Sequence, residues 1–292
     1  MTKLGVITDG ISRDLERALV VMNEYELEYA ELQFIGAKEV GDLDEGETAH
    51  VASLLAAHGV RVSCISRHIF AGLSLEALET DDAPWRAQLA ALRRCIASAQ
   101  RLDCPLVRVM SFRKEMILFG GNGAEEWVVA DEAWGRLVKR MAPAVRVAEQ
   151  EGITLVVETG NNAMIHSAWL GRKLIEELGS RHLRLLWDPA NSLYGDEPAW
   201  PDGYAALSGE AESLLGHLHI KDVQVCIPRA RVDCAELGTG DMAPYLPEIA
   251  TALKGDGYPG VISLESVYRP TTDGCFEDGF RASVGTLKRL FG

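Results

Sequence analysis

Four residues able to bind a cation stand at or near the ends of four successive apolar runs in the second half of the chain. The runs are ITLVVE (153–158), LRLLWD (183–188), LGHLHIK (215–221) and GVISLE (260–265), and the residues are Glu158, Asp188, His219 and Glu265. Three carboxylates and one imidazole form a mixed oxygen and nitrogen shell that suits Mn, Mg, Co or Zn. Three acids cannot lie close together, all ionised, without a cation between them. The spacing therefore predicts one divalent metal ion bound by these four side chains.

Each of these residues alone has a simpler interpretation. A single Glu or Asp that closes a strand is usually a helix N-cap or a surface charge, and a lone His219 would more often be a hydrogen-bonded core histidine. Four such residues at matching positions of four runs favour the metal site. His217 lies one layer deeper on the same strand face as His219, and we interpret it as structural.

Two basic residues within the apolar runs are candidates for substrate binding. Lys221 shares a strand face with His219, where it would steady an oxyanion or a substrate carboxylate, or else form a salt bridge to an acid such as Asp188. Arg108 lies inside the run PLVRVMS (105–111). A charged residue inside a strand requires a partner or a ligand, so Arg108 is a candidate for binding a substrate anion.

Two more candidates lie in segments that follow the runs. His68 comes just past the run VRVSCIS (60–66), where it would reach either the pocket or the surface. Arg269 comes four residues after Glu265 and would either close over the site or remain a solvated loop charge. Both are predicted substrate-binding residues.

Apolar runs alternate with amphipathic stretches along the whole chain, which indicates strands and helices in turn. Besides the four runs above, strands are predicted at 3–8, 29–34, 60–66 and 105–111, and helices at 11–23, 47–58, 85–102, 125–151, 167–178, 243–254 and 277–290, with a weak short helix near 203–212. Gly59 and Gly179 stand just past two of these helices, as C-terminal stops usually do.

Strands that are apolar on both faces pair in parallel, with helices covering both sides. Eight such units favour a closed (β/α)8 TIM barrel of the α/β class over an open doubly wound sheet. GVITDGIS, at the end of the first strand, lacks the G-x-G-x-x-G of a dinucleotide-binding fold. In a barrel, catalytic groups collect where the strands end, so the four ligand candidates can meet at one point. The long segments 112–127 and 194–204 follow strands on that face and are lid candidates.

Length and composition fit a single domain spanning residues 1–292. Of its 292 residues 47% are hydrophobic, which is ample for one core. The net charge of −14 and the pI near 5.0 disfavour a nucleic-acid partner. The six cysteines include no C-x-x-C pair, and the start MTKLGVITDG lacks the features of a secretory signal. No window approaches about 18 consecutive apolar residues, so we expect a cytoplasmic protein with reduced thiols and no membrane span.

The motifs resemble those of the xylose-isomerase-like barrel superfamily, which includes sugar isomerases and epimerases, inosose and dehydroshikimate dehydratases, and type IV apurinic endonucleases. The matching stretches, in the family's order along the whole chain, are GITLVVET (152–159), LLWDPAN (185–191), GHLHIKD (216–222), LGTGDM (237–242) and DGYPGVISLE (256–265). The resemblance implies a (β/α)8 fold, the four metal ligands named above, and Glu158 and Glu265 as acid and base.

Departures from the family patterns narrow the function. Where the endonucleases have D-x-x-H after the sixth strand, this chain has Asn191 in place of the His, and their D-x-H aligns with Val232-Asp233-Cys234. A trinuclear zinc site is therefore not expected. Ketohexose 3-epimerases keep that D-x-x-H and place an Arg six residues past the metal His, where this chain has Val225. Asn191 is retained as a substrate-binding candidate.

The resemblance favours a divalent-metal-dependent isomerase or epimerase that acts on a sugar or a sugar-like polyhydroxy keto substrate. A metal ion on the carbonyl and a neighbouring hydroxyl would stabilise the enediolate formed by proton abstraction. The same proton removal begins dehydration, so a dehydratase of inosose or 3-dehydroshikimate type is the alternative. An apurinic-endonuclease-like enzyme and a non-catalytic sugar-binding barrel rank below both. The expected partner is a small sugar-like molecule, with no nucleic acid and no membrane, and a homo-oligomer stays open.

Overall fold

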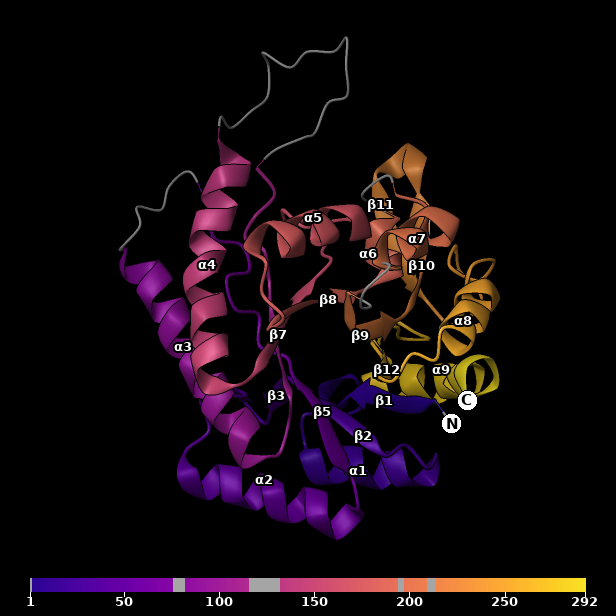
Figure 1. Cartoon of the computed structure of the whole chain (residues 1–292). Helices are drawn as coiled ribbons and strands as arrows, with labels where there is room; N and C mark the ends of the chain where they lie inside the picture. Colours follow the sequence, from indigo (N-terminus) through magenta and orange to yellow (C-terminus); the bar gives the residue numbers. More distant parts are fainter. Residues whose placement is uncertain (1, 76–81, 116–131, 194–196, 209–213) are drawn as a thin grey trace.

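Eight parallel strands close into a barrel in the order β1-β12-β9-β8-β7-β6-β5-β2 (Figure 1). The structure is a computed structural model that describes residues 2–75, 82–115, 132–193, 197–208 and 214–292. The barrel strands are β1 (Lys3–Ile7), β2 (Tyr29–Leu32), β5 (Arg61–Ile65), β6 (Leu106–Val109), β7 (Thr154–Glu158), β8 (Leu183–Trp187), β9 (Leu215–Ile220) and β12 (Val261–Leu264). Each lies within a predicted run, so the predicted (β/α)8 barrel is confirmed.

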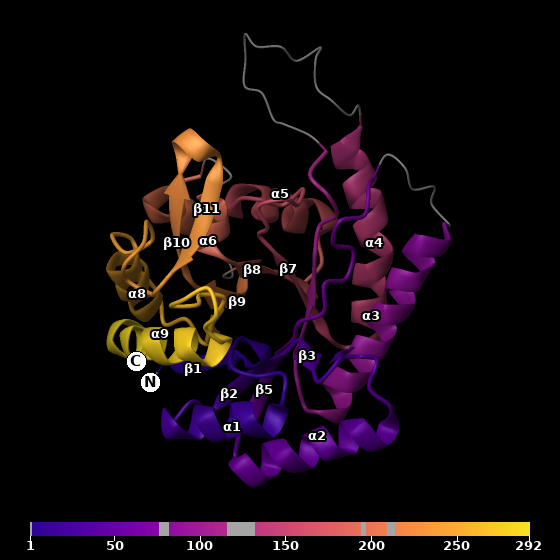
Figure 2. The same ribbon diagram turned by 180° about the vertical axis from the view of Figure 1, so that it is seen from behind.

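Helical segments follow every barrel strand and cover the barrel from outside. They are α1 (Leu15–Glu24), α2 (Glu45–His58), α3 (Ala83–Arg101), α4 (Ala133–Glu151), α5 (Ala168–Leu178), α6 (Pro189–Ser192), α7 (Tyr204–Leu207), α8 (Leu246–Gly255) and α9 (Phe276–Phe291). Helices α3 and α4 run side by side along one flank, with α8 and α9 on the opposite flank (Figures 1 and 2). The two chain ends lie close together because the first and last barrel strands are paired.

Helix ends follow the signals in the sequence. Asp44 and Glu47 form a reciprocal capping box at the start of α2, in which each side chain accepts the other's backbone N–H at 2.8 Å. Gly59 and Gly179 end their helices with φ values of 68° and 62°, a conformation that favours glycine, so both predicted stops are confirmed.

Several helix boundaries differ from prediction or extend outside the described residues; the helix predicted at 243–254, for example, begins only at Leu246. The helix predicted at 11–23 begins only at Leu15, because the carboxylate of Asp14 caps it by accepting two backbone N–H groups. The helix predicted at 125–151 is described from Ala133 onward. The weak helix near 203–212 corresponds to α7, and residues 209–213 lie outside the described part of the chain.

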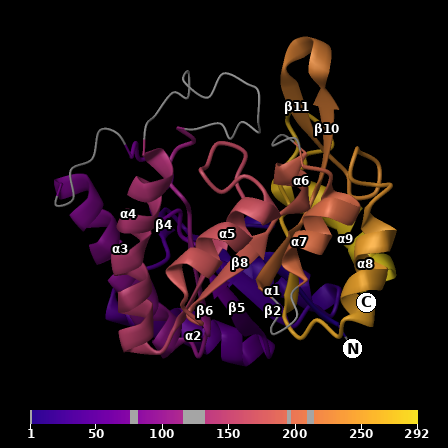
Figure 3. The same cartoon turned by 45° about the horizontal axis from the view of Figure 1, so that its top comes forward.

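Two hairpins were not predicted. The antiparallel strands β10 (Asp222–Cys226) and β11 (Arg231–Ala235) follow β9 directly and extend away from the barrel at the carboxyl end of that strand (Figure 3). The shorter pair is β3 (Phe34–Ile35) and β4 (Lys38–Glu39). β11 is exposed over nearly all its length, so its sequence lacks the alternation of buried and exposed residues that would reveal a strand.

The barrel interior separates into an apolar layer and a polar layer. A small cluster of Cys64, Val156 and Leu186 is distinct from the main core between strands and helices. Val156 and Leu186 share strand faces with Glu158 and Asp188, each two residues further on. The apolar cluster is therefore a floor beneath the charged residues at the carboxyl end of the strands.

The described helices include none that is long and apolar enough to cross a membrane. Of the two lid candidates, residues 116–127 and 194–196 lie outside the described residues. The lid role of both segments stays a prediction.

Candidate metal centre

Glu158, Asp188, His219 and Glu265 converge at the carboxyl end of the barrel. Glu158 is the last residue of β7, His219 lies one residue before the end of β9, and Asp188 and Glu265 directly follow β8 and β12. Each offers one ligand atom, and these four atoms all lie within 4.8 Å of one another. The Nδ1 atom of His219 is 3.5 Å from Glu158 Oε1 and 3.8 Å from Glu265 Oε2. The structure thus brings together all four residues predicted as ligands.

Strand register explains why the four side chains meet. In the parallel pairing of β12 with β9, Ser263 lies opposite His219, so Glu265 follows two residues later on the same face. In the pairing of β7 with β8, Glu158 lies opposite Leu186, and Asp188 again follows two residues later. Alternation along each strand turns these side chains into the barrel at similar height.

The donor atoms fit a divalent cation. His219 uses Nε2 to donate a hydrogen bond to Glu31 at 2.9 Å, while its buried Nδ1 has no hydrogen-bond partner and faces the carboxylates. The side chains of His219 and Asp188 are fully buried, that of Glu158 is 5% exposed, and that of Glu265 is 19% exposed. Buried carboxylates beside a ring nitrogen that can offer its lone pair once it is free of a proton form a shell for a hard or borderline metal ion, with Glu265 on the accessible side.

Lys221 places its ammonium among the same carboxylates. Its Nζ lies 2.6 Å from Asp188 Oδ2 and 2.7 Å from Glu265 Oε2. Burial alone would lower the pKa of Lys221, but Asp188, Glu265 and Glu158 raise it above its usual range, so the ammonium stays charged. The salt bridge to Asp188 that the sequence allowed is present, and substrate contact by Lys221 stays a prediction.

Arg108 is buried inside the barrel and pairs with Glu158. Its NH1 donates to Glu158 Oε2 at 2.9 Å, and its NH2 donates to the backbone oxygen of Ser66 and, at 3.5 Å, to Gln33 Oε1. Burial would raise the pKa of Glu158, but Arg108, together with His219 and Lys221, lowers it to about 2. The charged residue inside the strand therefore has a protein partner, and its contact with a substrate anion stays a prediction.

Two other members of the site have shifted pKa values. Burial, with Glu265 and Glu158 nearby, raises the pKa of Asp188 to about 7 despite the attraction of Lys221. Burial alone would lower the pKa of His219, but Glu31 and Glu158 raise it well above its usual range. In the absence of a cation, protons on these two groups relieve the repulsion among the carboxylates.

His68 and Arg269 lie further out. The half-exposed ring of His68 has its Nδ1 3.4 Å from Gln33 Nε2, and burial together with Arg108 lowers its pKa to about 4, so the ring is neutral at pH 7. Gln33 also accepts from Arg108, the partner of Glu158, so His68 lies at the outer end of this chain of contacts, at the mouth of the site. Arg269 is exposed and stacks 3.9 Å from the centroid of the Phe276 ring, so the structure does not bring it into the site.

Asn191 lies behind Asp188, in the short helix α6. Its Nδ2 donates to the backbone oxygen of Thr159 at 2.9 Å. The backbone N–H groups of Ala190 and Asn191 donate to Asp188 Oδ1, at 3.0 and 3.3 Å. This helix start holds one oxygen of Asp188 and leaves Oδ2 facing the site, so in this conformation Asn191 orients the Asp188 carboxylate.

Glu31 is a buried member of this region that sequence reasoning missed. It lies on β2 with no exposed surface, and its carboxylate accepts hydrogen bonds from His217 Nε2 at 2.8 Å and His219 Nε2 at 2.9 Å. The available signal was an acid within the apolar run YAELQF (29–34). The argument that marked Arg108, a charge inside a strand in need of a partner, applies equally to Glu31.

Asp222 was also missed, and it holds the loop that carries the LGTGDM motif. Its carboxylate accepts backbone hydrogen bonds from Val223, Gly238, Gly240 and Met242. A Cβ atom at position 240 would lie 2.4 Å from Asp222 Oδ1, which requires glycine there. The second glycine of this motif is therefore explained by close packing against Asp222, which follows directly after Lys221.

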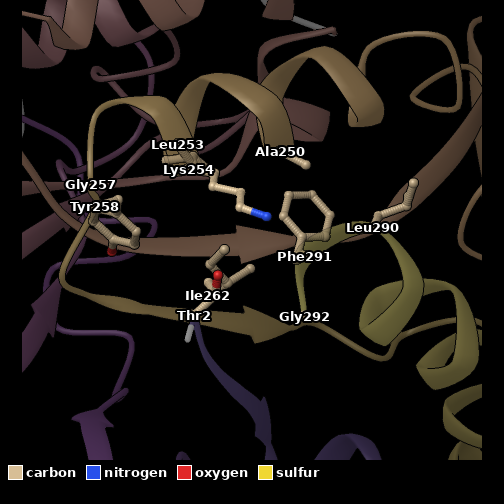
Figure 4. A pocket seen from close by; sticks show the side chains of 10 residues that line it. All are labelled: Thr2, Ala250, Leu253, Lys254, Gly257, Tyr258, Ile262, Leu290, Phe291 and Gly292. Atoms are coloured by element: carbon tan, nitrogen blue, oxygen red, sulfur yellow. The ribbon is translucent and has the colours of Figure 1, made fainter.

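A separate hollow of about 500 Å³ lies between α8, the end of α9 and β12 (Figure 4). Its lining includes Leu253, Lys254, Tyr258 and Phe291, with no His, Cys, Asp or Glu side chain. Its lining therefore offers no metal ligand set, unlike the cluster inside the barrel.

Comparison with known proteins places this geometry in a family. Comparison of the sequence with curated proteins gives no significant match. Among solved structures, the chain is similar to L-ribulose 3-epimerase, with 20% identity and a TM-score of 0.71, covering 100% of this chain and 95% of that chain. It is also similar to the probable 3-DHS dehydratase AsbF involved in petrobactin synthesis, from Bacillus anthracis, with 15% identity, a TM-score of 0.72 and coverage of 98% and 99%.

The apo form of 3-keto-D-glucoside 4-epimerase YcjR from E. coli gives 17% identity, a TM-score of 0.68 and coverage of 99% of both chains. At these identities the three structures show a shared fold. The sequence model of the family described as xylose isomerase-like TIM barrel matches residues 20–290. The chain belongs to the xylose isomerase-like TIM barrel family.

Proposed function

We propose that the chain is a divalent-metal-dependent isomerase or epimerase of a sugar-like polyhydroxy keto substrate. The observation that carries this proposal is the convergence of Glu158, Asp188, His219 and Glu265 on one point at the carboxyl end of the barrel. Solved structures with the same fold include epimerases of L-ribulose and of 3-keto-D-glucosides. A divalent ion held by these residues would act as a Lewis acid toward the substrate's carbonyl oxygen, which makes the adjacent C–H more acidic.

Glu265 and Glu158 are the proposed proton-transfer groups. They lie on either side of His219 Nδ1, at 3.8 and 3.5 Å. Glu265 is the more exposed of the two, so we assign to it the removal of the proton next to the carbonyl. Glu158 lies across the site and is ionised in the free chain, so it would first take a proton from solvent. Delivery of that proton to the opposite face, while Glu265 keeps the proton it removed, would give the epimer.

Three further side chains have proposed roles. Lys221 and His68 would bind the substrate, and Arg108 would hold Glu158 in position. The Lys221 ammonium beside Glu265 is placed to donate to a substrate oxygen. Arg108 keeps Glu158 ionised and fixed in position. The neutral, half-exposed ring of His68 offers a donor or acceptor for a hydroxyl group at the mouth of the site.

Asn191 and Arg269 stay predictions as substrate-binding residues. In the described conformation the Asn191 amide is hydrogen-bonded to Thr159, and Arg269 stacks on Phe276. Each would have to leave its partner to reach a substrate in the barrel.

A dehydratase of inosose or 3-dehydroshikimate type is the second candidate. Removal of the same proton begins the β-elimination of water, which also needs an acid to protonate the departing hydroxyl. The charged Lys221 ammonium, 2.7 Å from Glu265, is such a group. The similar fold of a probable 3-DHS dehydratase is compatible with this candidate.

Proton exchange in deuterated water tests both candidates. The chain, loaded with Mn2+ or Mg2+, is incubated with ketoses, inososes or 3-dehydroshikimate, and the products are examined by proton NMR and mass spectrometry. Deuterium at one carbon of an epimer or isomer supports the first candidate, and loss of water supports the second. The Glu265→Gln variant is the matched control and should give neither.

Two results would contradict the proposal. One is a wild-type chain that binds no divalent metal after full removal and re-addition. The other is exchange that continues at the same rate in the presence of excess EDTA.

A further inference from the structure

Glu31 lies at the centre of a fully buried group inside the barrel. Its Oε2 accepts from His217 Nε2 at 2.8 Å, its Oε1 accepts from His219 Nε2 at 2.9 Å, and the Ser66 hydroxyl also donates to Oε1. The side chains of Glu31 and His219 have no exposed surface, and that of His217 is 1% exposed. Both oxygens of one carboxylate are therefore occupied by imidazole N–H groups.

The Glu31, His217 and His219 side chains have the composition of a second metal site, but their geometry favours hydrogen bonding. Ring nitrogens at 2.8 and 2.9 Å from carboxylate oxygens are in direct N–H to oxygen contact. The Ser66 hydroxyl also donates to this carboxylate, so its three side-chain partners in the structure are all hydrogen-bond donors. This arrangement favours a supporting role for the group over a second metal site.

We propose that Glu31 is a positioning residue that holds the His219 ring with Nε2 protonated and Nδ1 directed at the cation site. His219 is shared by both groups, with Nε2 toward Glu31 and Nδ1 toward Glu158 and Glu265. An N–H bond from Nε2 fixes the tautomer in which Nδ1 carries the lone pair, and it fixes the ring orientation. This inference rests on the proposed metal site.

The structure also shows how the two oxygens of Glu31 differ. Oε1 serves His219 and Ser66, whereas Oε2 serves His217 alone. The other ring nitrogen of His217, Nδ1, is buried and has no hydrogen-bond partner. If the group at the Oε2 position were a donor, His217 could move its proton from Nε2 to Nδ1 without losing a bond at Nδ1. The same move in His219 would protonate the proposed ligand atom.

Three variants separate positioning from packing. Glu31→Leu removes the acceptor from His219. Glu31→Gln keeps an amide oxygen for His219 and Ser66 while its amide group donates to a His217 ring of the other tautomer. His217→Leu is the matched control, because it removes a buried partner of Glu31 on the same strand but leaves the bond from Glu31 to His219.

The measurement is Mn2+ affinity at pH 7.5, from the electron paramagnetic resonance signal of free Mn2+, with thermal unfolding of each metal-free variant beside it. Loss of such an outer partner typically weakens metal binding about 10- to 100-fold, and we expect this for Glu31→Leu. Glu31→Gln and His217→Leu should stay within about threefold of wild type, even though His217→Leu loses stability. Equal affinities in all variants would overturn the inference, as would a Glu31→Gln variant as weak as Glu31→Leu, since charge and not orientation would then explain the loss.

Nitrogen-15 NMR of labelled histidine is measured on the wild-type chain, so this test does not depend on whether a variant folds. With Zn2+ bound, His219 should keep its Nε2 proton while the Nδ1 signal shifts. Coordination through Nε2 would overturn the inference. A wild-type chain that binds neither Mn2+ nor Zn2+ would instead refute the proposed metal site, so the two failures are distinguishable.

Discussion

Replacement of Arg108 by methionine tests whether this buried guanidinium keeps Glu158 charged. The Arg108 side chain is 2% exposed and its partner Glu158 is 5% exposed, so neither is solvated. Methionine has a similar unbranched length and no charge. Arg108→Met therefore leaves a buried carboxylate without the cation that lies 2.9 Å away in the wild type.

The pKa of Glu158 gives the size of the expected effect. The fall from 4.5 to about 2, at about 1.4 kcal/mol per pH unit, means that the ionised carboxylate contributes about 3 kcal/mol to stability at pH 7. Burial acts in the opposite direction, so the favourable contribution of the nearby cations is larger than this net value. Breaking a buried ion pair by removing one partner typically costs about 3–5 kcal/mol, which we expect here.

Urea unfolding followed by circular dichroism, in EDTA at pH 7.5, measures the loss. Arg101→Met is the matched control, since Arg101 pairs with Glu45 at 2.8 Å on the surface, with side-chain exposures of 52% and 87%. That exposed pair should contribute less than about 1 kcal/mol. Saturating Mn2+ should narrow the gap between Arg108→Met and wild type, because a cation at the site neutralises Glu158.

The pH dependence has a definite sign. Glu158 has a folded-state pKa below its unfolded value, so its contribution is complete above about pH 4.5 and is lost as the pH falls toward 2. The gap between Arg108→Met and wild type should therefore shrink in acid. A loss no larger than that of Arg101→Met, or a gap independent of both Mn2+ and pH, would refute the assigned role of Arg108.

Three further predictions concern the other charged side chains. Glu158→Gln and Glu265→Gln should each lower turnover by roughly 10³-fold or more while circular dichroism shows a folded chain, and near-native turnover in either would contradict the acid–base assignment. The apparent Kd for Mn2+ should rise about tenfold per pH unit for each proton that must leave, and more steeply below the Asp188 pKa of about 7, where Asp188 as well as His219 carries a proton; titrations at pH 5.5, 6.5 and 7.5 that agree would be inconsistent with this. Lys221→Met should bind Mn2+ about tenfold more tightly by calorimetry, since its ammonium competes for Asp188 and Glu265, and unfold more easily without metal; unchanged affinity would rule out that competition.

The convergence of the four ligand candidates could be predicted from sequence because it depends on two local rules. Side-chain alternation placed Glu158 and Glu265 on inward faces, and parallel strands bring their carboxyl ends to one face of a barrel. Neither rule needs the exact pairing between strands. The pairing of Glu158 opposite Leu186 is therefore an observation of the structure and was not needed for the prediction.

The partners of the buried charges could be predicted only in part. Arg108 and Glu158 lie on neighbouring strands β6 and β7, with Arg108 opposite Val156, so their pairing follows once the strand order is known. Glu31 and His219 lie on β2 and β9, which are not neighbours in the barrel. Their contact crosses the interior and depends on barrel closure and on which side chains are small enough to leave room.

Two errors of the sequence analysis have other causes. One is the start of the first helix, predicted at residue 11 and found at Leu15, and the other is the missed β10–β11 hairpin. The sequence offers Asp9, Ser12 and Asp14 as possible N-caps before the same apolar stretch, and it does not show which of them caps the helix. The β10–β11 hairpin is stabilised mainly by its own backbone pairing and is largely exposed. Exposed strands carry little periodic signal, because no buried face selects apolar residues at every second position.

The net charge of the buried groups around His219 couples metal binding at this site to the protonation of its side chains. The charged side chains in contact around His219 are the acids Glu31, Glu158, Asp188 and Glu265 and the cations Arg108 and Lys221. Four negative and two positive charges leave an excess of two negative charges in a buried space. The raised pKa values of Asp188 and His219 show how the metal-free chain compensates, because each group can hold one proton. One divalent cation carries the same two charges, so its binding should release these protons, which is why affinity and pH are coupled at this site.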